Sequence, residues 1–122
     1  MKKKILIVDD SSTVRLQISR VLAAAGFDVA QAQDGVEGAE VIDQGEVSLV
    51  LCDVNMPRMN GLSMVELVRS QARHAALPIL MLTTEGQSRM IRRARDAGAK
   101  GWIVKPFSPE LLVTTVQKFV SA

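Results

Sequence analysis

Hydrophobic and polar positions along the chain alternate between two periods. Short, nearly continuous apolar runs are typical of strands buried on both faces of a parallel sheet. Each run is followed by a segment with apolar residues three or four positions apart, which is typical of an amphipathic helix. The expected strands cover residues 4–8, 28–32, 47–53, 79–83 and 101–104. The third and fourth of the five expected helices cover about residues 62–72 and 87–97. The pattern therefore predicts the order βαβαβαβαβα.

Local signals mark the ends of these helices. Ser11 or Ser12 can cap the first helix, and Gly26 can adopt the left-handed conformation that follows it. Asp34 and Glu37 are spaced as a capping box at the start of the second helix. The local signals and the periodicity agree along the chain, which favours one well-defined fold.

Helices that connect successive parallel strands cross over with a right-handed sense, so they must cover both faces of the sheet. We therefore expect an α/β fold, a three-layer sandwich around a five-stranded parallel sheet. The 122 residues fit one domain, residues 1–122. Periodicity alone leaves the order of the strands open.

Polar residues stand at the ends of four of the expected strands. Asp9 and Asp10 follow the first strand, Asp53 ends the third, Thr83 ends the fourth and Lys105 follows the fifth. The carboxyl ends of parallel strands meet at the edge where open α/β sheets bind ligands. Three carboxylates, a hydroxyl and an ammonium at one edge suit a divalent metal together with a phosphoryl group.

The balance of charge argues against nucleic acid as a partner. The chain has 15 basic and 13 acidic residues and a formal net charge of +2, which is too even to indicate nucleic-acid binding. Aromatic residues make up 3% of the chain, and there is no tyrosine, so a stacking platform for single strands is missing. We expect no direct binding of nucleic acid.

The sequence predicts a soluble, cytoplasmic protein with no membrane attachment. No apolar stretch is long enough to span a bilayer. Residues 1–4 begin like a signal peptide, but the apolar run 5–8 is too short and two acids follow it. The single cysteine, Cys52, excludes an internal disulfide and a cysteine metal cage, and we expect it in the core. The single histidine, His74, is expected to be a structural surface residue.

Four motifs in this order resemble the receiver domain of bacterial response regulators, of the stand-alone CheY-like type. They are Asp9-Asp10, residues 53–61 (DVNMPRMNG), residues 82–85 (LTTE) and residues 101–107 (GWIVKPF). The resemblance covers essentially the whole chain, and its specificity lies in the combination of motifs. It implies the flavodoxin-like (βα)5 fold with strand order 2-1-3-4-5. It also implies two-component or phosphorelay signal transduction.

The resemblance implies that Asp53 is the phosphoacceptor and that the site holds Mg²⁺, for which Mn²⁺ is expected to substitute. Negative charge crowds around the nucleophile, the phosphoryl group and the leaving group, so a cation must offset it. Mg²⁺ binds oxygen ligands and keeps waters. By resemblance Asp10 and Asp53 ligate it directly, Asp9 acts largely through water, and the backbone carbonyl of Asn55 completes the protein ligands.

The resemblance assigns further roles around the phosphoryl group. Lys105 pairs with one phosphoryl oxygen, and Thr83 donates a hydrogen bond to another. Asn55 and Glu85, each two residues beyond a site residue, flank the path of an attacking water and tune dephosphorylation. Trp102 stands where receivers commonly have tyrosine or phenylalanine, the aromatic that turns inward as the threonine moves. Indole is larger, and its N–H needs a partner if it is buried, so the ease of this switch is in question.

The expected fourth helix is rich in arginine. A solvated helix face is the plainer interpretation of Arg89, Arg92 and Arg93. In receivers this helix, the fifth strand and the fifth helix form the output face, so an acidic surface on a downstream target protein is the competing interpretation, with Trp102 also on that face. The phosphodonor implied is a histidine kinase or a phosphotransfer protein. The chain has no room for a helix-turn-helix module beyond the receiver.

Two other functions compete with a phosphorylation-switched signalling module. A haloacid-dehalogenase-like, Mg²⁺-dependent phosphatase also uses Asp, Thr or Ser, and Lys. In that family the nucleophile is on the first strand with an acid two residues later, whereas here Asn55 follows Asp53 at that spacing. A phosphorylation-independent interaction domain is the third option. We expect that the chain is not an enzyme and that it catalyses only its own phosphorylation and dephosphorylation. The pathway stays open among chemotaxis, pilus-type motility and a phosphorelay.

Overall fold

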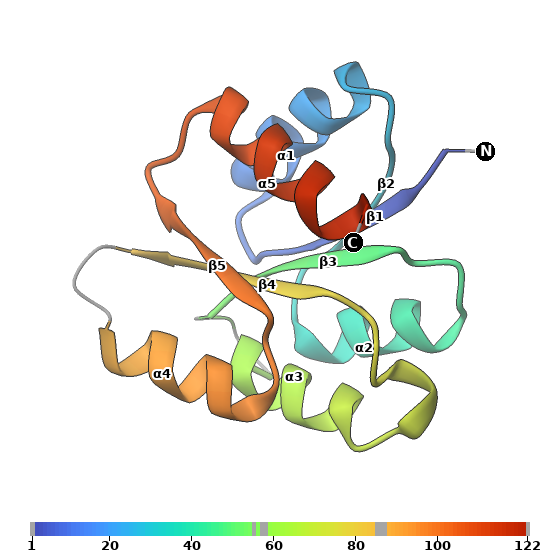
Figure 1. Cartoon of the computed structure of the whole chain (residues 1–122), viewed down its shortest axis with the longest axis vertical. Coiled ribbons are helices and arrows are strands. Elements are labelled where there is room, and N and C mark those ends of the chain that lie inside the picture. The colour runs from blue at the N-terminus through green and yellow to red at the C-terminus, as the bar shows by residue number, and fades with distance from the viewer. Residues whose placement is uncertain (1, 55, 57–58, 85–87, 122) are drawn as a thin grey trace.

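Five parallel strands form one sheet in the order β2-β1-β3-β4-β5 (Figure 1). The computed structural model describes residues 2–54, 56, 59–84 and 88–121. The strands are β1 (Lys4–Val8), β2 (Asp28–Ala32), β3 (Leu49–Asp53), β4 (Ile79–Thr84) and β5 (Gly101–Lys105). The helices are α1 (Ser12–Ala24), α2 (Gly35–Asp43), α3 (Gly61–Arg69), the 3₁₀ turn η1 (Ala72–His74), α4 (Ser88–Ala97) and α5 (Pro109–Ser121). The predicted fold class and the order implied by the resemblance are confirmed.

The helices cover both faces of the sheet. Helices α1 and α5 lie on one side, and α2, α3 and α4 lie on the other (Figure 1). Successive strand residues point to opposite faces. Ile5 and Ile7 therefore pack with α1 and α5, while Leu6 and Val8 pack under α2 and α3. Because both faces are buried, the strands appear in the sequence as continuous apolar runs.

Two predicted helix caps are present. The Ser11 hydroxyl accepts a hydrogen bond from the Val14 backbone N–H at 3.3 Å, so Ser11 is the cap of α1. Asp34 Oδ1 accepts from the Glu37 N–H at 2.9 Å at the start of α2. Gly26 follows α1 with φ +97°, as the sequence predicted. These caps fix the point at which the chain leaves β1 and β2, and so help to place the residues that follow β1.

The third helix is shorter than predicted. It ends at Arg69, and the separate 3₁₀ turn η1 follows, where the sequence predicted helix to residue 72. The Arg69 guanidinium donates to the His74 carbonyl at 2.6 Å and to the Gly98 carbonyl at 3.0 Å. These long-range contacts hold the segment between α3 and β4 in a compact turn, and periodicity does not reveal them.

None of the helices in the described part of the chain has both the length and the apolar character needed to cross a bilayer.

Candidate functional site

The strand register brings the predicted polar residues to the carboxyl edge of the sheet. Val8 is level with Cys52, so Asp9 and Asp53 follow side by side on the neighbouring strands β1 and β3. Asp53 is level with Leu82, which places Thr83 one step further on β4. Thr84 in turn is level with Lys105 on β5. Four strands therefore deliver side chains to one place.

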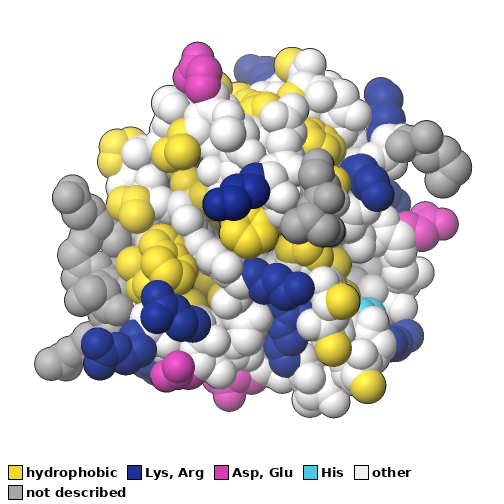
Figure 2. Space-filling model, viewed as in Figure 1, with side chains coloured by type: hydrophobic (Ala, Val, Ile, Leu, Met, Phe, Trp, Pro, Cys, Tyr) yellow, Lys and Arg dark blue, Asp and Glu magenta, His cyan; other side chains and the backbone are white. Residues whose placement is uncertain are grey.

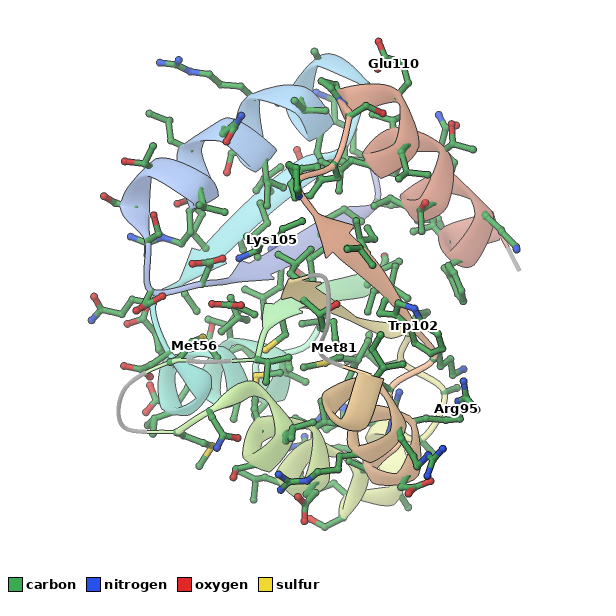
Figure 3. All side chains as sticks on the ribbon, turned by 90° about the vertical axis from the view of Figure 1, so that its left-hand side faces the viewer. Met56, Met81, Arg95, Trp102, Lys105 and Glu110 are labelled. Atoms are coloured by element: carbon green, nitrogen blue, oxygen red, sulfur yellow. The ribbon has the colours of Figure 1, made fainter. Side chains whose placement is uncertain are left out.

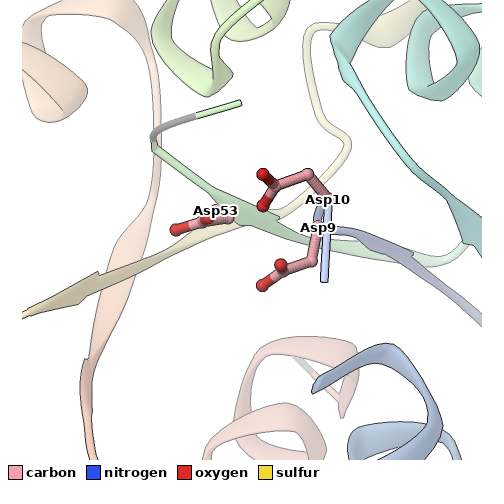
Figure 4. Close-up of side chains that lie close together, drawn as sticks. All are labelled: Asp9, Asp10 and Asp53. Atoms are coloured by element: carbon pink, nitrogen blue, oxygen red, sulfur yellow. The ribbon is translucent and has the colours of Figure 1, made fainter. Parts of the chain in front are cut away.

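Three carboxylates form the centre of this place. Single oxygens of Asp9, Asp10 and Asp53 all lie within 4.8 Å of one another. Figure 4 shows the three side chains gathered where β1 and β3 end. Asp9 is buried, Asp53 is half-buried and Asp10 is exposed. A set of carboxylate oxygens with one exposed member fits a hard divalent cation that keeps part of its water, such as Mg²⁺.

Lys105 provides a cation beside two of these acids. Its Nζ lies 3.4 Å from Asp9 Oδ2 and 3.4 Å from Asp53 Oδ1. Burial raises the pKa of the Asp53 carboxyl, the charge of Lys105 opposes the rise and the charge of Asp9 adds to it, so the net pKa lies above the ordinary value. One ammonium beside a cluster of three carboxylates leaves an excess of negative charge that a divalent cation would balance.

Asp53 is held from the α3 side. The Val54 N–H donates to Asp53 Oδ1 at 3.0 Å, and the Gly61 N–H donates to the Val54 carbonyl at 2.9 Å. A Cβ on Gly61 would overlap the backbone carbonyl oxygen of Asp53. The first residue of α3 must therefore be glycine for the helix to start this close to the end of β3.

Asp9 is held from the α1 side, in part by a residue that the sequence did not single out. Asp9 Oδ1 accepts from the Ser11 N–H at 2.9 Å. The Arg15 Nη1 donates to the Asp9 backbone carbonyl at 2.6 Å, and its Nε donates to Gln31 Oε1 at 3.2 Å. An arginine one turn into the helix that follows an acidic pair is the only sequence signal for this contact, and it is a weak one.

Thr83 is a buried hydroxyl residue. Its exposed fraction is 1%, and among the residues that the structure describes its Oγ1 has no hydrogen-bond partner. Leaving a buried hydroxyl unpaired has a free-energy cost. Thr83 and Met81 point to the same face because they are two residues apart on one strand. The hydroxyl could therefore donate to an acceptor that arrives at this edge.

Trp102 lies on β5 level with Met81, on the same face as Thr83. It is half-buried and packs against the core cluster under α2, α3 and α4. The Arg95 guanidinium lies over the indole, 5.2 Å from the ring centroid (Figure 3). Lys105, on the same strand, points into the acidic site instead (Figure 3).

The predicted output face carries mixed chemistry. Figure 2 shows Lys and Arg side chains beside hydrophobic ones on the side of the molecule that displays β5, α4 and α5. Arg92 and Arg93 are exposed on α4. Asn55, Glu85 and the side chain of Arg89 lie outside the described residues, so the predictions for them remain predictions.

Comparison with known proteins gives one consistent result. The family model for the response regulator receiver domain matches residues 5–117. The chain is 45% identical to the Chemotaxis protein CheY1 of Helicobacter pylori over 111 residues, covering 89% of this chain and 90% of that protein. It is 43% identical to the Chemotaxis protein CheY homolog of Campylobacter jejuni, covering 89% of this chain and 85% of that protein.

The structural comparison agrees. The chemotaxis response regulator CheY4 of Vibrio cholerae superimposes with a TM-score of 0.92 at 40% identity, covering 98% of this chain and 99% of that one. The sequence and structure matches give no support to the haloacid-dehalogenase alternative.

Proposed function

The chain belongs to the response regulator receiver domain family of two-component phosphoacceptors, and on that premise we propose that Asp53 takes the phosphoryl group. The donor is a histidine kinase or a phosphotransfer protein. Phosphorylation changes the affinity of the chain for a downstream target protein. Residues 1–122 act as a single receiver domain that catalyses only its own phosphorylation and dephosphorylation. The observation that carries the proposal is the meeting of Asp9, Asp10, Asp53 and Lys105 at one edge of the sheet.

The reaction forms one bond and breaks one. A carboxylate oxygen of Asp53 attacks the phosphorus atom, and the P–N bond of the donor phosphohistidine breaks on the opposite side. The electron pair of that bond stays on the imidazole nitrogen. The Val54 N–H donates to Asp53 Oδ1, and Lys105 Nζ lies 3.4 Å from the same oxygen, so both contacts help to orient the carboxylate. Positioning and offset of charge then supply most of the catalysis.

We propose that the site binds Mg²⁺ and that Mn²⁺ can replace it. Asp10 and Asp53 would ligate it directly, and Asp9 largely through water, together with the backbone carbonyl of Asn55. Asp10 is exposed, whereas the buried Asp9 carboxylate already accepts from the Ser11 N–H and contacts Lys105, which supports the less direct role for Asp9. When bound, the ion offsets the negative charge between nucleophile and phosphoryl group.

The phosphoryl group then acquires protein partners. Lys105 Nζ, at 3.4 Å from both Asp9 and Asp53, is close enough to turn to a phosphoryl oxygen. Thr83 donates its hydroxyl, which has no partner among the described residues, to another oxygen and moves toward it. Trp102, on the same face, takes up the space that Thr83 leaves. Asn55 and Glu85 tune the lifetime of the phosphoryl group.

The signal leaves through α4, β5 and α5. Arg92 and Arg93 are exposed on α4 and suit a target with an acidic surface, and we expect Arg89 and Trp102 to take part as well. The similarity to proteins named for chemotaxis favours chemotaxis or motility as the pathway. We assign the chain to the cytoplasm, with neither nucleic acid nor a membrane as a partner.

Intact mass measurement tests the proposal. Incubation with acetyl phosphate and Mg²⁺ should add one phosphoryl group to the wild-type chain and none to Asp53→Asn. Circular dichroism should show that Asp53→Asn folds, since asparagine is similar in shape to aspartate. Equal labelling of the two proteins would remove Asp53 as the acceptor.

A further inference from the structure

Arg95 contacts the aromatic residue that the proposed function treats as mobile. Its guanidinium lies 5.2 Å from the centre of the Trp102 ring, within the range of a cation–π contact. Figure 3 shows the pair at the end of α4 that faces away from the acidic site. Arg95 is exposed, so the substitution of its side chain leaves the core intact. Trp102 is the only tryptophan in the chain, which makes it a specific probe.

The backbone under Arg95 is anchored. The Gly98 N–H donates to the Arg95 carbonyl at 3.0 Å, and the Gly98 carbonyl accepts from Arg69 Nε at 3.0 Å. Gly98 has φ +116°, and a Cβ there would lie 2.8 Å from Arg69 Cγ. The last turn of α4 is therefore tied to α3, and Arg95 contacts Trp102 from a fixed position.

Thr83, whose movement would draw Trp102 away from Arg95, lies on the neighbouring strand β4. Thr83 is level with Val104, so Trp102 is its diagonal neighbour on the adjacent strand and points to the same face. The buried Thr83 hydroxyl lacks a partner among the described residues. A phosphoryl oxygen would satisfy it and favour movement of Thr83. Any inward turn of Trp102 that follows would separate the indole from Arg95.

We propose that Arg95 is a positioning residue that holds Trp102 in the orientation seen here and so favours the unphosphorylated arrangement. The inference rests on the proposed function, because it needs a phosphoryl group at Asp53 and a response at Thr83. A ligand shifts the equilibrium between the two orientations of Trp102 only by its differential affinity for them. The Arg95 contact stabilises the orientation seen here, so it acts as a restraint that opposes the shift that a phosphoryl group would cause. Removal of the contact should make the phosphoryl-bound arrangement easier to reach.

The expected effect has a definite sign. An exposed cation–π contact corresponds to about a two- to five-fold change in an equilibrium constant. Arg95→Gln should therefore tighten the binding of beryllofluoride, a phosphoryl mimic, by about two- to five-fold at saturating Mg²⁺. If Arg95 acted only through the electrostatic field of its positive charge, the loss of that charge would weaken binding of this anion. The restraint and a simple charge effect thus predict opposite results.

Isothermal titration of beryllofluoride into the full chain with Mg²⁺ measures this affinity. Arg95→Lys keeps the charge but loses the planar guanidinium, and should give an intermediate affinity. Arg20→Gln removes an exposed arginine from α1, on the opposite side of the sheet, and should match the wild type. In a Trp102→Leu background, Arg95→Gln should change nothing, because the partner of the contact is gone.

The outcomes separate the two proposals. Unchanged or weaker binding by Arg95→Gln, or the same tightening in the Trp102→Leu background, overturns the restraint and leaves the phosphoryl site intact. A wild-type chain that binds Mg²⁺ but no beryllofluoride overturns the proposed phosphoryl site, and the restraint with it.

Discussion

Lys105 Nζ lies 3.4 Å from Asp53 Oδ1, although the two residues are 52 positions apart and β4 separates their strands. The distance is longer than that of a close hydrogen bond, about 2.7–3.2 Å. Lys105 is therefore an ion-pair partner of Asp53 that can turn to another anion without breaking a tight contact. This relationship makes the edge of the sheet suitable for a phosphoryl group as well as for a metal.

Removal of the Lys105 charge should impair phosphorylation. Lys105→Met is expected to slow labelling by acetyl phosphate by about a hundredfold, because a fixed cation facing the developing charge is lost. The pKa of Asp53 should rise further, since Lys105 opposes that rise. Time-resolved intact mass measures the rate. Lys118→Met, which changes an exposed lysine on α5, is the control. A Lys105→Met rate equal to that of the control would contradict the role of Lys105.

Asp53 should make the metal-free protein sensitive to pH. In the folded chain the pKa of Asp53 lies above 3.8, the value for the unfolded chain. The contribution of Asp53 to the free energy of unfolding is therefore fully present below pH 3.8 and is lost as the pH rises through the folded pKa. Without metal, Asp53→Asn should therefore be more stable than the wild type at neutral pH, and the gap should close toward low pH. Mg²⁺ should narrow the neutral-pH gap. Urea unfolding with a chelator and with Mg²⁺ measures both effects.

A neutral-pH gap that persists unchanged down to about pH 3, below the unfolded pKa, would contradict this account. The gap would then come from packing rather than from ionisation of Asp53.

Mg²⁺ binding should depend on Asp10. Asp10→Ala removes an exposed carboxylate whose oxygen lies within 4.8 Å of those of Asp9 and Asp53. We expect the affinity measured by isothermal titration to fall by at least about tenfold. Asp28→Ala changes an exposed acid at the start of β2, at the other end of the sheet, and serves as the control. Equal affinity in Asp10→Ala and the control would remove Asp10 from the metal site.

Thr83 should matter for the response and little for the fold. Thr83→Val keeps the shape of the side chain and removes a buried hydroxyl without a partner among the described residues. Stability should stay the same or rise by about 1 kcal/mol. The change in Trp102 emission that beryllofluoride and Mg²⁺ cause in the wild type should shrink. An undiminished emission change in a variant that binds beryllofluoride would show that Trp102 does not follow Thr83.

The sequence predicted the fold and the site to different depths. The apolar runs predict the strands because both faces of the sheet are buried, and Ser11 and Asp34 mark two helix starts through local hydrogen bonds. The site residues could be found because each follows a strand, so position in sequence becomes position in space.

Contacts between distant side chains could not be predicted in this way. Arg69 reaches Gly98, 29 positions away, and His74 Nε2 lies 3.0 Å from Asp43 Oδ1, 31 positions away. The sequence predicts a structural surface residue at His74. Only 11% of its side chain is exposed, so most of it is covered. Its hydrogen bond to Asp43 lowers the pKa of that carboxyl. The contact of Arg95 with Trp102 is of the same kind. Periodicity places each residue on a helix or strand but does not select the partner of a long flexible side chain.

The most direct test locates the phosphoryl group itself. Borohydride reduces an aspartyl phosphate to homoserine, so treatment of the phosphorylated chain followed by peptide mass spectrometry identifies the acceptor. We predict homoserine at Asp53 and at no other acid, dependent on Mg²⁺ and absent without phosphodonor. Homoserine at Asp9 or Asp10 instead, or a chain that gains a phosphoryl mass without homoserine at Asp53, would contradict the account.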